Sequence, residues 1–181
     1  MTKYASEQYI QQLRVLHGDI RRSRGFGGKF KKVKPFEKFL EKHNPSTVLD
    51  YGCGKGTMLY TYREMYPHIE FDGYDIAIDE FTKISKDSYD VVFSNDVLEH
   101  IEPEYLANVI THISQLSSRF IWLRIDTKPA KKILKDGRNA HLILETQPWW
   151  ESKLMHLIDA RIIYSDLTTK GKLDIVLEKG L

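Results

Sequence analysis

Short apolar runs and helical stripes alternate along most of the chain, and this order predicts an α/β fold. Each predicted strand is rich in Val, Ile, Phe or Leu, while the segments between them carry apolar residues at helical spacing. The predicted strands cover 47–50, 69–75, 91–93 and 119–126, and the helices between them cover 58–66 and 102–113. Such alternation is typical of a Rossmann-like, mostly parallel sheet with helices on both faces.

The two ends of the chain extend this pattern. Residues 4–17 carry a helical apolar stripe, and a second amphipathic helix begins near Pro35. Near the C-terminus a helix is predicted from Pro148, followed by two strands joined by a turn at 169–172, an antiparallel hairpin. We interpret residues 1–181 as one domain with an N-terminal helical cap (1–44) and an insertion (127–148) on the substrate side.

Composition narrows the protein class. The single cysteine, Cys53, excludes an intramolecular disulfide. No apolar run approaches the ~18 residues of a membrane span, and the N-terminus lacks an apolar signal core, so we expect a cytoplasmic protein without membrane contact. Net charge is only +2, but residues 20–34 form a basic arm that could contact nucleic acid, although we favour the simpler interpretation of a solvated loop.

The most informative stretch is Thr47-Val-Leu-Asp-Tyr-Gly-Cys-Gly-Lys-Gly-Thr57. A buried strand ends at Asp50, and glycines follow at 52, 54 and 56 before the predicted helix. Glycine lets the backbone approach a ligand closely, and the helix start adds free N–H groups. A dinucleotide fingerprint would place its third glycine one residue later. Asp50 also favours a cationic ligand over a pyrophosphate.

This stretch resembles the first motif of class I S-adenosylmethionine (SAM)-dependent methyltransferases. The resemblance implies SAM as the cofactor, with Asp50 near its methionine end and the glycine backbone against the ligand. It also implies that Asp75, at the end of the second strand, binds the ribose hydroxyls. The implied cofactor-binding residues are Asp50, Tyr51, Gly52, Cys53, Gly54, Gly56, Asp75, Ile76, Asn95 and Asp96.

One segment departs from the family pattern. Only fourteen residues, 76–89, separate the second strand from the next apolar run, where the family normally fits a helix and a third strand. We therefore predict that the helix is missing and the third strand vestigial. Ile76, Asp79 and Phe81 are then the candidates for an adenine contact.

A second motif, Asp90-Val-Val-Phe-Ser-Asn-Asp-Val-Leu-Glu-His-Ile101, resembles the family's D-h-h-h-x-x-x-h-L-E-H. Asp96, Glu99 and His100 fall at i, i+3 and i+4, so a helical turn would place them on one face. His100 could act as a general base, and Asp96 and His141 could face the acceptor with it. The spacing is also similar to the metal-binding E-x-x-E-H of small-RNA 2′-O-methyltransferases. Helix capping explains Glu99 as well, and we assign no metal ligand from the sequence.

The sequence does not name the methyl acceptor. There is no Asn/Asp-Pro-Pro-Tyr tetrad after the strand at 91–93, and Cys53 fits packing in the turn better than nucleophilic attack. We expect a small-molecule or sugar hydroxyl or amine as acceptor. The alternatives are an RNA ribose hydroxyl with a divalent metal, and a non-catalytic SAM-binding or scaffold protein. The oligomeric state is left open.

Overall fold

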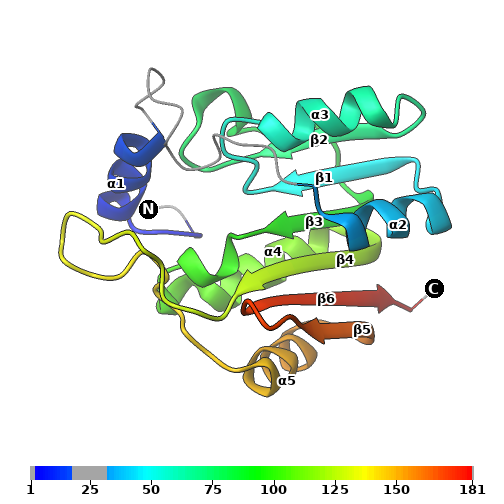
Figure 1. Cartoon of the computed structure of the whole chain (residues 1–181). Helices are drawn as coiled ribbons and strands as arrows, with labels where there is room; N and C mark the ends of the chain where they lie inside the picture. The colour runs from blue at the N-terminus through cyan, green and yellow to red at the C-terminus, as the bar shows by residue number, and fades with distance from the viewer. Residues whose placement is uncertain (1–2, 18–31, 181) are drawn as a thin grey trace.

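The computed structural model describes residues 3–17 and 32–180 and contains one six-stranded sheet (Figure 1). The strands are β1 (Thr47–Tyr51), β2 (Glu70–Tyr74), β3 (Tyr89–Asn95), β4 (Ser117–Asp126), β5 (Ala160–Leu167) and β6 (Lys172–Lys179). Their order across the sheet is β2-β1-β3-β4-β6-β5. The first four strands pair in parallel, and β6 lies antiparallel between β4 and β5. The predicted mixed sheet with a C-terminal antiparallel hairpin is confirmed.

Helices cover both faces of this sheet. The helices of the described chain are α1 (Glu7–His17), α2 (Lys34–His43), α3 (Thr57–Met65), α4 (Leu106–Leu116) and α5 (Gln147–Leu157), with short 3₁₀ turns η1 (Asp79–Phe81), η2 (Leu98–His100) and η3 (Pro103–Tyr105), and α2 to α5 cover the two faces. Apolar side chains of α2 and α3 pack with one face, and those of α4 and α5 pack with the other. Trp150 of α5 is fully buried in the second of these cores, so it anchors the helix rather than lining a pocket.

Alternation along the central strands explains this two-sided core. In β1, Val48 packs with α2 and α3 while Leu49 packs with the α4 side, and in β3 Val91 and Val92 divide in the same way. Successive side chains of a strand point to opposite faces, and a parallel sheet is stable when both faces are covered. The middle of each central strand is therefore a continuous apolar run, as the sequence predicted.

The predicted shortening between β2 and β3 is also confirmed. Residues 76–88 contain only the three-residue turn η1, so this segment adds no strand to the outer edge of β2. Phe81 of η1 is buried and packs with the α3 side of the sheet. This aromatic ring replaces part of the apolar cover that a full helix would supply.

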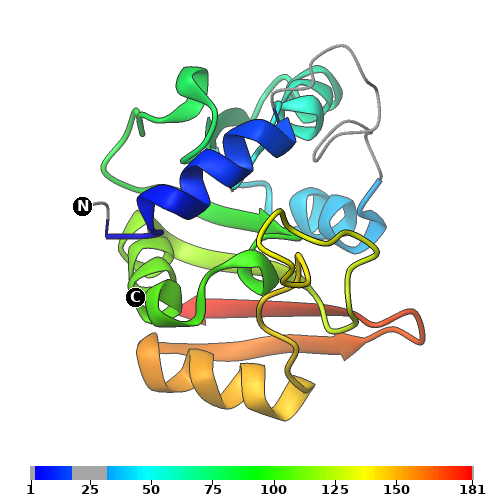
Figure 2. The same cartoon turned by 90° about the vertical axis from the view of Figure 1, so that its left-hand side faces the viewer.

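Two segments lie over the carboxyl ends of the parallel strands. Figures 1 and 2 show α1 crossing this end, with the segment between β4 and α5 beside it. Tyr9 and Ile10 of α1 pack against Leu134 and Ala140 of that segment. Carboxyl ends of parallel strands are where open α/β sheets bind ligands, so both segments are positioned to enclose a site.

Candidate active site

A cavity of about 800 Å³ opens at the carboxyl ends of the parallel strands. Its wall on one side is the glycine turn after β1, and its other walls come from α1, the 96–102 segment, residues 126–132 and the β5–β6 turn. A volume of this size suits a drug-sized ligand. Tyr4 and Tyr9, from the N-terminal part of the chain, line the cavity.

The glycine turn is fixed by main-chain hydrogen bonds. The amides of Gly52 and Cys53 donate to the Tyr74 carbonyl at 2.7 and 3.1 Å. Gly52, Gly54 and Gly56 have φ values of 83°, 55° and 70°, which L-residues rarely adopt. A Cβ on Gly52 would also lie 2.3 Å from a methyl of Val97. This turn therefore requires glycine for its conformation, and Gly52 requires it for space as well.

Two buried acids stand beside the turn. Asp75 accepts hydrogen bonds from the amides of Gly54 at 2.9 Å and Ala77 at 2.8 Å. Asp50 is 5% exposed, and its burial, followed by the nearby charge of Asp75, raises its pKa to about 7. Two neighbouring carboxyl groups in a cavity wall make this end attractive to a cation.

Nearly all the predicted cofactor-binding residues line the cavity. Those that do are Asp50, Tyr51, Gly52, Cys53, Gly54, Asp75, Ile76, Asn95 and Asp96. Gly56 is absent from the wall; it precedes α3, and a Cβ there would meet Phe81 and Tyr60 at 2.9 Å. Of the adenine candidates only Ile76 reaches the cavity. Burial raises the pKa of the Cys53 thiol, which agrees with a packing role.

The cavity wall also holds two imidazoles. The rings of His100 and His141 lie 4.8 Å apart at 79°, and both residues line the wall. His100 Nδ1 lies 2.7 Å from the Ala140 carbonyl, and His141 Nδ1 contacts the Lys128 carbonyl. A carbonyl only accepts, so each Nδ1 carries a proton, and in the neutral ring Nε2 then presents a lone pair.

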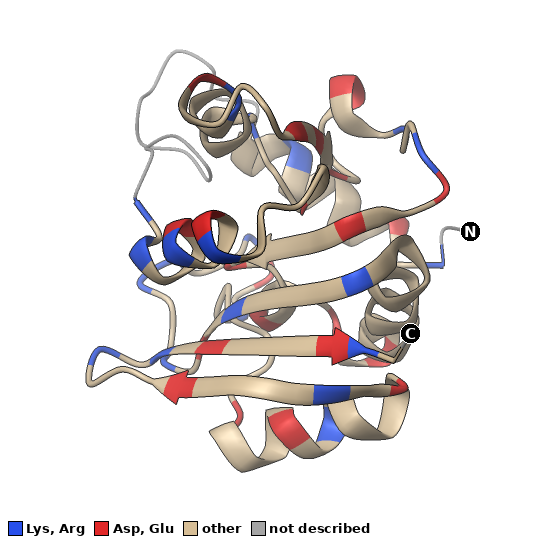
Figure 3. Ribbon diagram, turned by 90° about the vertical axis from the view of Figure 1, so that its right-hand side faces the viewer, with Lys and Arg blue, Asp and Glu red and all other residues tan. Residues whose placement is uncertain are grey.

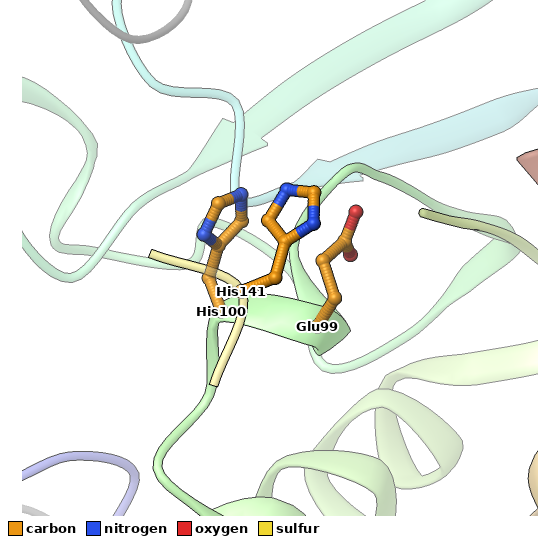
Figure 4. A group of neighbouring side chains, drawn as sticks. All are labelled: Glu99, His100 and His141. Carbon is orange, nitrogen blue, oxygen red and sulfur yellow. The ribbon is translucent and has the colours of Figure 1, made fainter. Parts of the chain in front are cut away.

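Glu99 completes a cluster with these two histidines (Figure 4). One ligand atom from each of Glu99, His100 and His141 lies within 4.8 Å of the others. Oε1 of Glu99 accepts from the Asp126 amide at 2.8 Å, whereas Oε2 is buried and has no hydrogen-bond partner among the residues that the structure describes. Histidines that bind a metal typically donate a hydrogen bond from the other ring N–H to a backbone carbonyl. A carboxylate is also a common metal ligand. The cluster could hold a divalent cation.

Burial controls protonation in this cluster. It lowers the pKa of His100 to about 4, and burial with the charge of Asp96 raises the pKa of Glu99 to about 8. A base is most effective when its pKa lies near the working pH, and His100 falls well below neutrality. The protonation behaviour of His100 therefore suits a ligand better than a general base.

Asp96 does not share a helical face with Glu99 and His100, so that prediction was wrong. The helical turn η2 begins only at Leu98, and Asp96 has a φ of 57°. Asp tolerates this left-handed conformation better than most residues, which lets the chain turn sharply after β3. The Asp96 carboxylate is instead 2.7 Å from Lys172 Nζ.

Lys172, at the start of β6, is the main site residue that sequence reasoning missed. Its Nζ bridges Asp96 at 2.7 Å and Asp126 at 2.9 Å, and the side chain lines the cavity. The hairpin register places Lys172 opposite Asp126. The sequence signal that could have identified Lys172 is a lysine next to a predicted hairpin turn together with an acid at the end of an earlier strand. Tyr9 of α1 also lines the wall, and its hydroxyl donates a hydrogen bond of 2.6 Å to the His100 carbonyl.

Comparison with known proteins decides the family. The profile of a methyltransferase-domain family matches residues 26–166, most of the chain. The chain belongs to this methyltransferase family. Its resemblance to class I SAM-dependent methyltransferases is thus confirmed, and the dinucleotide-binding alternative is not supported. Among curated proteins no sequence matches significantly.

Solved structures of methyltransferases share the fold. The 1,6-didemethyltoxoflavin-N1-methyltransferase of Burkholderia thailandensis, with bound 1,6-didemethyltoxoflavin and S-adenosylhomocysteine, superposes with a TM-score of 0.66 at 16% identity, over 98% of this chain and 91% of that one. Magnesium protoporphyrin IX methyltransferase of Synechocystis PCC 6803, with bound SAM, has a TM-score of 0.61 and 18% sequence identity. The match covers 96% of this chain and 92% of that one. The mitomycin 7-O-methyltransferase has a TM-score of 0.62 and 14% sequence identity, and the match covers 99% of this chain and 64% of that one. Within residues 3–17 and 32–180, no helix is long and apolar enough to cross a membrane.

Proposed function

We propose that this methyltransferase transfers a methyl group from SAM to a hydroxyl group of a small molecule. One observation carries the proposal: a glycine turn with two acids and the imidazoles of His100 and His141, which form a cluster with buried Glu99, all belong to the wall region of one cavity. Methyl transfer is a direct displacement, so the donor sulfur, the methyl group and the acceptor oxygen must lie on one line. Two chemically different ends of one cavity suit that requirement.

The acidic end fits the donor. SAM carries an ammonium group and a sulfonium, and buried Asp50 and Asp75 offer the opposite charge. Asp75 fixes the amides of Gly54 and Ala77, and its position after β2 suits the ribose hydroxyls of an adenosine. SAM or S-adenosylhomocysteine bound in two similar folds supports the same donor here.

The residues at the other end fit a divalent cation. Its ligands would be the buried Oε2 of Glu99 and the Nε2 atoms of His100 and His141. A bound divalent cation would lower the pKa of an acceptor hydroxyl and so favour the nucleophilic alkoxide. The two histidines, held by the carbonyls of Ala140 and Lys128, keep their orientation without the substrate. A hydroxyl acceptor is therefore favoured over an amine.

An RNA ribose hydroxyl is the second candidate acceptor. The D-x-x-E-H spacing is similar to the metal motif of small-RNA 2′-O-methyltransferases, and His141 joins Glu99 and His100 from a distant part of the chain. Asp96 differs from that pattern, because its carboxylate pairs with Lys172. The basic arm at 20–34, which could hold a nucleic acid, lies largely outside the described residues.

The proposal is tested by methyl transfer from radiolabelled SAM. The acceptor panel is sugars, small phenols and ribonucleosides, with a single-stranded RNA as a separate arm, each with Mg²⁺, with Mn²⁺ and with EDTA. We expect labelled product from a hydroxyl acceptor, lost in EDTA and restored by metal. Product from RNA alone would move the second candidate to first place. A folded protein that binds neither SAM nor S-adenosylhomocysteine would instead indicate a scaffold.

A further inference from the structure

Charge is distributed unevenly along the cavity. The glycine end carries the acids Asp50 and Asp75, whereas lysines gather around the rest of the wall. They come from the segment after β4 and from the β5–β6 hairpin, whose tip carries basic residues in Figure 3. The lysines of the wall are Lys128, Lys131, Lys132, Lys170 and Lys172.

The acids near these lysines are already engaged. Asp96 and Asp126 both pair with Lys172, and Glu102 accepts two hydrogen bonds from Ser6, at 2.8 and 2.9 Å. Within residues 3–17 and 32–180, Lys131 and Lys170 form no ion pair and are exposed. This part of the wall therefore carries a positive charge that no described acid neutralises.

The two segments that carry these lysines are hydrogen-bonded to each other. The Thr127 amide donates to the Gly171 carbonyl at 2.9 Å, and Lys128 Nζ donates to the Thr169 carbonyl at 3.1 Å. A Cβ on Gly171 would lie only 2.7 Å from the Lys128 side chain, so the contact is close. Charges on two segments that are already joined form a preorganised site, which reduces the entropy lost on binding.

We propose that Lys131 and Lys170 belong to a subsite that binds a phosphate group of the methyl acceptor. This inference rests on the proposed function, because it assigns the acceptor to the lysine end of the same cavity. Lysine is a strongly hydrated point charge that commonly binds phosphate, whereas paired arginines are the usual clamp for a carboxylate. Several lysines around one end match the double charge of a phosphate. The acceptor class is thus a phosphorylated hydroxyl compound, either a small molecule or a nucleic-acid strand.

The test compares full-length K131E/K170E with a matched control, K38E/K42E. The control makes the same charge change on exposed lysines of α2, which do not line the cavity. Pyrophosphate, AMP and a ten-nucleotide single-stranded RNA are each titrated at two salt concentrations. We expect K131E/K170E to lose about tenfold or more in affinity for at least one probe, and the control to stay within about twofold.

The different probes distinguish a small phosphorylated acceptor from a nucleic-acid strand, and the SAM titration distinguishes failure of the subsite from failure of the proposed function. Loss with AMP and pyrophosphate would support a small phosphorylated acceptor, and loss with RNA alone would support a strand. No binding by the wild type, equal binding by K131E/K170E, or equal loss in the control would overturn the subsite. SAM is titrated into every sample: unchanged SAM affinity shows that the variants fold, and failure of the wild type to bind SAM would overturn the proposed function instead.

Discussion

The two ends of the cavity are built in different ways. The donor end is made by one stretch of chain, from Asp50 to Ala77, and its key contacts are hydrogen bonds that main-chain amides donate to the Tyr74 carbonyl and the Asp75 carboxylate. The acceptor end is made by side chains from distant segments: His100 after β3, His141 in the segment before α5, and Lys172 at the start of β6. Its contacts include His100 with Ala140, 40 positions apart, and Lys172 with Asp96, 76 positions apart.

This difference indicates which end can change. A turn whose conformation depends on its own backbone tolerates few substitutions, so the ligand specificity of the donor end should change little. The acceptor end depends on side chains carried by loops, where substitution alters shape and charge without disturbing the sheet. Variants should therefore separate into those that abolish SAM binding and those that abolish transfer while SAM still binds.

The largest effect is expected from His141→Ala. It removes one imidazole of the cluster but leaves the glycine turn unchanged. Methyl transfer should fall by about 10²- to 10⁴-fold, while SAM affinity stays within about twofold. Single-turnover transfer and calorimetric titration measure the two quantities.

The matched control is His156→Ala, an exposed histidine of α5 outside the cavity. It should change neither quantity. Equal loss of SAM affinity and transfer in His141→Ala would contradict the division into two ends.

Gly52→Val should abolish SAM binding. Its φ of 83° and the 2.3 Å approach of a Cβ to Val97 add strain and overpacking, together about 2–5 kcal/mol. SAM affinity should fall about 100-fold or more by calorimetry. Gly137→Val is the control, because Gly137 has a similar φ of 85° but nothing within 4 Å of its Cβ position. It should lower the melting temperature slightly and leave SAM affinity intact. If both variants bind SAM equally well, the tight turn is not required.

Asp75→Asn should weaken SAM binding by about tenfold, since it removes the charge and one of the two acceptors that hold the Gly54 and Ala77 amides. Asp79→Asn is the control: its side chain is 93% exposed and pairs only weakly with Arg14, at 3.5 Å. Equilibrium titration of both variants gives the comparison. A normal affinity in Asp75→Asn would remove this residue from the donor end.

The smallest effect is a pH dependence set by Asp50. Burial raises its pKa from 3.8 to about 7, so the native carboxyl keeps its proton where the unfolded one has lost it, and stability declines as pH rises from about 3.8 to 7. A cationic ligand favours the ionised form. SAM affinity should therefore increase by about tenfold between pH 6 and 8. Asp50→Asn should bind SAM more weakly, without that increase, and should be more stable than the wild type above pH 7.

The donor end could be predicted from the sequence more completely than the acceptor end. The glycine turn, Asp75 and the shortened 76–89 region were all predicted, because each depends on residues close together in the chain. His141 was only a candidate, since its approach to His100 depends on how the segment after β4 folds back. Lys172 was missed because its pairing with Asp96 and Asp126 follows from the register between β4 and β6. Asp96 was placed on a helical face because a positive φ leaves no periodic signal in the sequence.

The most direct test of the two-ended site is calorimetric titration of SAM into the wild type, Gly52→Val and His141→Ala, followed by single-turnover methyl transfer with the best hydroxyl acceptor. We predict that the wild type and His141→Ala bind SAM with similar affinity and that Gly52→Val does not bind. Only the wild type should then transfer the methyl group efficiently. Full transfer by His141→Ala, or SAM binding that survives Gly52→Val, would contradict this account of the site.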